Sequence, residues 1–163
     1  MANYKLIIEE DFNTDFSLLA IHCSEDAYKM AYLLNRHVGL KLRRRRTDLD
    51  YSKQGLEISF PWFEFEDENE YTTYDLLANK FRTKSARTVA SGGLFAEEDS
   101  EEIVTVYLIP ELRNVDYFLK ISSDSMQLPL RKLVHEINDI NEVISVYTVE
   151  IDQLKSKHNL IFD

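Results

Sequence analysis

Four consecutive arginines form the longest run of like charge in the sequence: Arg43, Arg44, Arg45 and Arg46. Guanidinium groups bind phosphate through paired hydrogen bonds, so this run could contact RNA or a phosphorylated ligand. The same groups could instead pair with acids of the chain, which are concentrated in segments 64–70 and 97–102. In an extended strand, alternate side chains point to opposite faces, so only two of the four arginines would share a face. We therefore favour internal pairing over phosphate binding.

Aromatic residues are crowded into the segment that follows, at Phe60, Trp62, Phe63, Phe65, Tyr71, Tyr74 and Phe81. Aromatic side chains dominate the energetics of interfaces, and they are also enriched in sheets. We expect most of them to pack in the core. Trp62 and Phe63, together with the four arginines, are the residues that we single out for a contact surface.

The sequence contains no pattern typical of a catalytic or metal site. His22 and Cys23 are neighbours in an expected strand, so their side chains point apart. His135 and Asp139 could share a helix face, but zinc requires three or four ligands. We therefore predict no catalytic residue, no metal and no cofactor.

The composition is that of an acidic globular protein. The chain has 163 residues and a formal net charge of −10. Such a charge repels phosphate backbones and disfavours nucleic acid as a partner. The single cysteine, Cys23, cannot form an internal disulfide, which favours a cytoplasmic location. No apolar run approaches the length of a membrane span, so we expect no membrane contact.

A strand–helix–strand pattern occurs once near each end of the chain. Apolar residues at helical spacing predict one helix between Ser24 as its N-cap and Gly39 as its C-terminal cap, and a second that begins at Pro129. The flanking strands are expected at residues 16–22, 40–43, 115–122 and 143–149. Two such units can interleave into one antiparallel sheet with both helices on one face. That is the ferredoxin-like arrangement, which the ACT ligand-binding domain shares.

The middle of the chain, about 48–102, is expected to insert extra strands into this pattern. Aromatic runs at 56–66 and 71–77 are separated by a polar turn, and Pro61 predicts an edge or a bulge within the first run. Segment 103–109 predicts a further strand, and Lys84–Glu102 a surface loop. We therefore predict a single α+β domain over residues 1–163. Its sheet is mainly antiparallel, with two helices on one face.

Residues 109–117 form a polar turn between two expected strands. Pro110 lacks an N–H group and ends the first strand, while Val115 and Tyr117 return the chain on a buried face. Glu111 and Asp116 flank the turn and could accept hydrogen bonds from its backbone N–H groups. Alternatively, the two carboxylates could form a polar ligand site. We favour the structural role.

This turn resembles the signature of the IPExxxVDY family, a bacterial family. All six fixed positions match: Ile109, Pro110, Glu111, Val115, Asp116 and Tyr117. The C-terminal run 155–162 is also similar to the way in which members of that family end. The resemblance implies membership over the whole chain, but it transfers no activity, cofactor or binding site.

The function that we expect first is a non-catalytic, cytoplasmic binding or regulatory module that acts through contacts with a partner protein, with a homodimer left open. A small-ligand sensor of the ACT type is an alternative suggested by the two strand–helix–strand units. No glycine stands at Ser24 or near Ser125 to let a ligand approach closely, which weakens that alternative. RNA binding through Arg43–Arg46 is the third hypothesis.

Overall fold

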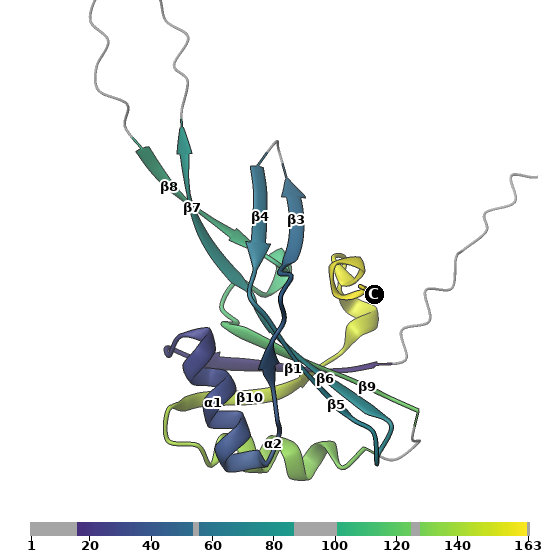
Figure 1. Ribbon diagram of the computed structural model, residues 1–163. Helices are drawn as coiled ribbons and strands as arrows, with labels where there is room; N and C mark the ends of the chain where they lie inside the picture. Colours follow the sequence, from purple (N-terminus) through teal and green to yellow (C-terminus); the bar gives the residue numbers. More distant parts are fainter. Residues whose placement is uncertain (1–15, 54–55, 87–100, 125–127, 163) are drawn as a thin grey trace, which may run out of the picture.

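The computed structural model describes residues 16–53, 56–86, 101–124 and 128–162, which form an α+β fold (Figure 1). Three short 3-10 helices accompany the helices and strands. The elements in chain order are β1 (Phe16–Cys23), α1 (Ala27–Val38), β2 (Arg43–Arg44), β3 (Leu49–Lys53), β4 (Leu56–Phe60), β5 (Trp62–Asp67), β6 (Thr72–Ala78), β7 (Lys80–Ala86), β8 (Glu101–Tyr107), η1 (Pro110–Leu112), β9 (Tyr117–Ser123), α2 (Leu130–Asn138), β10 (Val143–Val149), η2 (Ile151–Gln153) and η3 (Lys157–Leu160).

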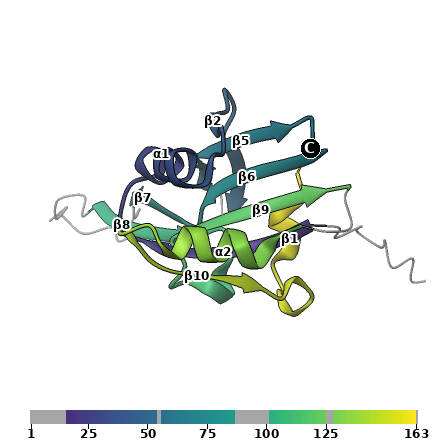
Figure 2. The same ribbon diagram turned by 90° about the horizontal axis from the view of Figure 1, so that it is seen from below.

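The main sheet is antiparallel and has the strand order β10-β1-β9-β6-β5-β2. Its first four strands show the expected interleaving, because the units β1–α1–β6 and β9–α2–β10 alternate across the sheet. Figure 2 shows α1 and α2 on the same face of this sheet. The predicted α+β class, with a mainly antiparallel sheet and extra strands, is confirmed.

The strand that follows α1 differs from the expectation. Segment 40–43 contributes only to the two-residue β2 at the outer edge, whereas β6 lies beside β9. β5 and β6, from the segment expected as an insertion, are therefore part of the main sheet. The physical reason is burial, because an inner strand packs against apolar layers on both faces. The Leu76-Leu77-Ala78 end of β6 is buried and suits that place, and an arginine run does not.

The two helices are bounded by local capping interactions. The Asp26 carboxylate accepts a hydrogen bond from the Lys29 N–H at 2.8 Å, so the N-cap of α1 is Asp26 and not Ser24. Gly39 adopts a φ of +80°, as expected for a C-terminal cap. α2 begins directly after Pro129, as the sequence predicts.

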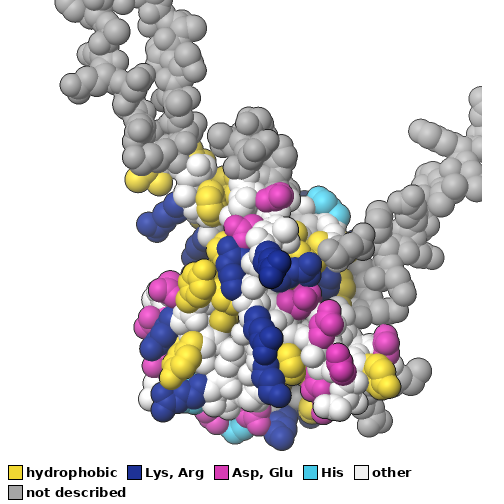
Figure 3. Space-filling model, in the orientation of Figure 1, with side chains coloured by type: hydrophobic (Ala, Val, Ile, Leu, Met, Phe, Trp, Pro, Cys, Tyr) yellow, Lys and Arg dark blue, Asp and Glu magenta, His cyan; other side chains and the backbone are white. Residues whose placement is uncertain are grey.

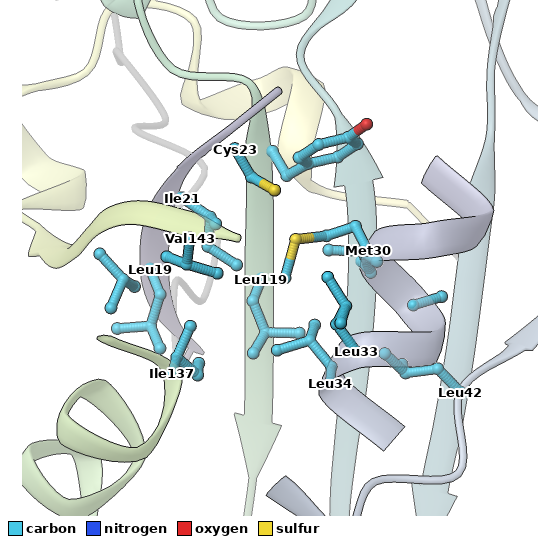
Figure 4. Packing of buried hydrophobic residues seen from close by; sticks show 14 of the residues in the cluster. Leu19, Ile21, Cys23, Met30, Leu33, Leu34, Leu42, Leu119, Ile137 and Val143 are labelled. Atoms are coloured by element: carbon cyan, nitrogen blue, oxygen red, sulfur yellow. The ribbon is translucent and has the colours of Figure 1, made fainter. Parts of the chain in front are cut away.

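One core fills the space between the helices and the sheet. Figure 4 shows Leu33 and Leu34 of α1 and Ile137 of α2 directed toward Leu19 and Leu119 of the sheet. All five side chains are buried. Burying a leucine or isoleucine contributes roughly 1.5–3 kcal/mol, so this layer holds both helices on the sheet.

A second core lies on the opposite face of the sheet. Here Leu18 and Phe118 pack with Phe60 of β4 and with Leu160 of η3. Val115 also belongs to this core, whereas Tyr117 belongs to the helix-side core. The expectation that Val115 and Tyr117 share a face is wrong, because β9 begins only at Tyr117 and the alternation of a strand does not extend back to Val115.

The middle segment divides at Pro61 into two strands of different sheets, where the sequence predicted an edge or a bulge within one run. β4 pairs with β3 in a separate hairpin, and β5 enters the main sheet. β7 and β8 form a second hairpin, paired from Lys80 and Tyr107 to Ala86 and Glu101. Both ends of the predicted loop Lys84–Glu102 are therefore strand, and its residues 87–100 lie outside the described residues.

Candidate interaction surface

The signature turn is part of the framework of the fold. Ile109 and Val115 are buried in the second core, and Pro110 starts η1. The Tyr117 hydroxyl donates a hydrogen bond to the Glu25 carbonyl oxygen, next to the N-terminus of α1. These side chains join β8, β9 and α1, which supports the structural role that we favour.

Asn79, a residue that sequence reasoning missed, holds the backbone of this turn. It lies between β6 and β7 and is fully buried. Its side-chain NH2 donates to the carbonyl oxygens of Leu112 at 2.8 Å and Val115 at 2.9 Å, and its side-chain oxygen accepts from the Ile109 N–H at 2.9 Å. One amide therefore satisfies three backbone groups, and a lone asparagine after an apolar strand gave no sign of this in the sequence.

Glu111 and Asp116 bind other segments and not the N–H groups of their own turn, which corrects the expected hydrogen bonding. The Asp116 carboxylate accepts from the Cys23 N–H at 2.9 Å and from Lys80 Nζ at 2.9 Å. The Glu111 carboxylate accepts from the Ser156 hydroxyl at 2.6 Å and fixes the C-terminal segment. The turn does not need them, because Asn79 already binds its backbone.

Substitutions at these carboxylates should separate the structural role from a ligand site. We expect Asp116→Ala to lower the free energy of unfolding by roughly 1.5–3 kcal/mol, because charge-assisted hydrogen bonds are lost. Asp116→Asn should cost less, since one amide oxygen can still accept from the Cys23 N–H. Urea unfolding measures the free energy of unfolding of both variants. Glu111→Gln, at an exposed side chain, is the control and should lower this free energy less than Asp116→Ala does. Unchanged or increased stability of all three variants would point to a ligand site.

The arginine run is half neutralised by nearby acids. Arg44 forms an ion pair with Asp48, and Arg45 forms one with Glu64 at 2.7 Å. The Arg45 guanidinium also lies 3.8 Å from the centroid of the Trp62 ring, in a cation–π contact. Arg43 and Arg46 are exposed. Internal pairing therefore accounts for the two middle arginines.

Trp62 and Phe63 are core residues, which corrects their expected place in a contact surface. Their exposed fractions are 4% and 3%. The reason is that β5 lies inside the sheet, so its two faces are covered by the two cores. The aromatic residues that do reach the surface include Tyr28 and Tyr32 of α1, at 66% and 50% exposure.

A buried pair of opposite charges lies under Trp62. Asp75 of β6 and Lys120 of β9 are paired across the two strands, and both are buried. The Trp62 indole N–H donates to the Asp75 carboxylate at 2.7 Å, and Lys120 Nζ lies 4.1 Å from the centroid of the Phe162 ring. Burial raises the pKa of Asp75 to about 6, and burial lowers the pKa of Lys120. No charged residue pattern in the sequence marked this pair.

Exposed tyrosines and cations meet where α1 approaches β2. We call this surface the α1–β2 face, and it comprises Tyr28, Lys29, Tyr32, Arg36 and Arg44. The edge of the Tyr28 ring contacts Phe63 at a centroid distance of 5.3 Å, and Arg44 lies over the same Phe63 ring. Arg36 donates to the Tyr32 hydroxyl at 3.1 Å. Figure 3 shows Lys and Arg side chains gathered over β2, with Asp and Glu side chains beside them toward β5 and β6.

Two hollows adjoin the helices. An open groove of about 530 Å³ has Lys41 and Arg43 on one side and the acidic run from Glu64 to Glu68 on the other. A smaller cleft of about 200 Å³ lies between the end of α1 and the start of α2, with Leu40, Tyr74 and Leu133 among its lining residues. The groove offers charges of both signs, and the cleft offers an apolar wall.

Metal and nucleophilic sites find no support in the part of the chain that the structure describes. No group of three or more potential metal ligands occurs there. The His22 ring nitrogen shares a hydrogen bond with the Tyr147 hydroxyl at 3.1 Å, while the Cys23 thiol is buried on the other face. Burial raises the pKa of Cys23, which disfavours the reactive thiolate.

Comparison of the chain with protein-family models, with curated proteins and with solved structures gave no match. Membership of the IPExxxVDY family therefore stays a prediction from the nine-residue signature. Within the described residues, neither helix is long and apolar enough to cross a membrane.

Proposed function

We propose that this protein is a non-catalytic binding module that contacts a partner protein through the α1–β2 face. The observation that carries the proposal is the exposure of Tyr28 and Tyr32 beside the cations Lys29 and Arg36. Tyrosine and arginine are enriched among the residues that dominate binding energy at protein interfaces. A tyrosine also presents a large contact area with few rotatable bonds, so its ordering costs little.

The charge of this face specifies the chemistry of the partner. Three cations gather here on a chain whose net charge is −10, and only Arg44 has an acidic partner among the described residues. An acidic segment of a partner would be attracted to this face and repelled by the rest of the molecule. We therefore propose an acidic, protein-borne partner.

Two features favour protein over RNA as the partner. Arg44 and Arg45 are already paired with Asp48 and Glu64, so they are not free to bind phosphate. The adjoining groove carries the acids Glu64 and Glu66, which would repel a second phosphate beside the first. RNA binding therefore has less support than it had from the arginine run alone.

The small-ligand alternative rests on the cleft between the helices. Its volume of about 200 Å³ falls below the roughly 300–1,000 Å³ of typical ligand pockets. That volume suits a single side chain better than a metabolite.

We also propose that the protein acts in the cytoplasm, since its one cysteine is a buried free thiol.

The test compares what wild type and matched variants capture from native lysate. We expect Tyr32→Ala and Arg36→Glu to lose the proteins that wild type retains reproducibly, because changing a hot-spot residue weakens binding by roughly 2 kcal/mol, or about 30-fold. Lys132→Glu, a charge reversal on the exposed surface of α2, is the control and should keep them. Capture that is equal for all variants would refute the α1–β2 face. Salt-dependent binding of a labelled RNA oligonucleotide, lost in Arg43→Glu, would favour RNA instead.

A further inference from the structure

The two outer strands of the main sheet are each covered by an asparagine of the helix that precedes them. At one edge, the Val146 N–H of β10 donates to the Asn138 side-chain oxygen at 3.0 Å, and the Asn138 NH2 donates to the Val146 carbonyl oxygen at 3.3 Å. At the other edge, Leu42, the residue directly before β2, forms the same pair of bonds with Asn35, at 2.8 Å and 3.0 Å. Figure 2 shows α2 along β10 and α1 along β2.

The geometry of the sheet shows that these asparagines bind the outward edges. The Ile21 carbonyl oxygen accepts a hydrogen bond from the Asp116 N–H, so the backbone groups of Ile21 point toward β9. Backbone groups alternate in direction along a strand, so Ala20 and its partner Tyr147 bond to each other between β1 and β10. The groups of Val146 must then point away from β1, where another strand would otherwise bind.

The β10 edge would be a strong template for strand pairing without Asn138. The strand Val143–Val149 has seven residues and contains neither a charged residue nor a proline, which are the usual protections of an edge. Ile144 and Tyr147 add exposed apolar surface, at 71% and 42% exposure. The opposite edge is different, because β2 is short and stands within the arginine run.

We propose that Asn138 closes the β10 edge to a second copy of this chain, and that β10 is the surface through which copies associate when this side chain is removed. Two β10 strands related by a twofold axis at Val146 can pair antiparallel, which joins the two sheets into one. No charged side chain within β10 itself opposes this pairing. A second copy thus supplies the hydrogen bonds that Asn138 makes in the monomer.

The experiment measures self-association of variants by sedimentation over a wide range of concentration, with circular dichroism to verify folding. We expect Asn138→Ala to shift from monomer to dimer as concentration rises. Asn35→Ala loses the same two bonds at the other edge and is the matched control. It should stay monomeric, because paired arginine runs would repel. Adding Ile144→Lys to Asn138→Ala should abolish the dimer, since an edge lysine blocks pairing.

Several outcomes would overturn the proposal. If Asn138→Ala folds but stays monomeric at every concentration, the proposal is contradicted. If Asn35→Ala associates as much as Asn138→Ala, the proposal is also contradicted, because association would then come from a general loss of stability.

Amide hydrogen exchange on the wild type gives a readout that needs no variant. The Thr148 N–H is the next outward group on this edge. We expect the Val146 N–H to exchange more slowly than the Thr148 N–H, by a factor of roughly ten or more. Equal exchange of the two amides would show that Asn138 does not hold the edge.

Discussion

Asn79→Ala is expected to lower the free energy of unfolding by about 2–6 kcal/mol. The substitution leaves two buried backbone groups without their partner, the Ile109 N–H and the Val115 carbonyl oxygen. It also removes one of the two hydrogen bonds to the Leu112 carbonyl oxygen, which keeps the bond from the Val115 N–H. Each unsatisfied buried group costs about 1–3 kcal/mol, because it has lost water on folding and gained nothing in return. The loss is large against the 5–15 kcal/mol stability of a typical domain.

The measurement is urea unfolding of Asn79→Ala beside a matched asparagine. Asn159→Ala is the control, since the Asn159 NH2 donates a single hydrogen bond, to the Leu108 carbonyl oxygen at 2.8 Å, in the same region. We expect this control to cost about 1 kcal/mol, the usual net value of one hydrogen bond. Equal effects of the two substitutions would show that the turn backbone finds other partners, and that Asn79 is not the residue that holds the signature turn.

Asp75 is expected to make the protein less stable as the pH rises from about 4 to about 7. Burial raises the pKa of Asp75 in the folded protein to about 6, against an ordinary value of 3.8. Between these two values the folded state binds more protons than the unfolded state, so stability falls as pH increases. A difference of about two pKa units corresponds to about 3 kcal/mol, which is present below the lower value and lost above the higher.

Asp75→Asn should remove this dependence, because the amide keeps an acceptor for the Trp62 N–H and carries no charge at any pH. The unfolding free energy of the variant should therefore rise relative to wild type between pH 4 and pH 7. Asp152→Asn makes the same chemical change at an exposed site and controls for the substitution itself. If wild type instead gains stability over Asp75→Asn as pH rises, the attraction between Asp75 and Lys120 outweighs the cost of burial.

Local chemistry in the sequence was enough to predict several elements. The end of α1 follows from Gly39, because only a residue without a Cβ adopts a φ of +80° at little cost. The start of α2 follows from Pro129. The alternation of two strand–helix–strand units predicted the α+β class and the shared face of the helices. Each of these rests on neighbours along the chain.

Tertiary structure alone decided which strand lies beside which. It therefore also decided where the buried charges lie and which backbone groups the asparagine side chains bind. Nothing local tells β6 to pair with β9, and only that pairing sets Asp75 opposite Lys120. Asn79, Asn35 and Asn138 act on backbone groups that other segments bring to them, so an asparagine in the sequence gives no sign of its role. Trp62 and Phe63 are typical of a contact surface by composition, yet the two cores enclose them. The physical reason is that side-chain type depends on the residue, whereas burial depends on packing between distant segments.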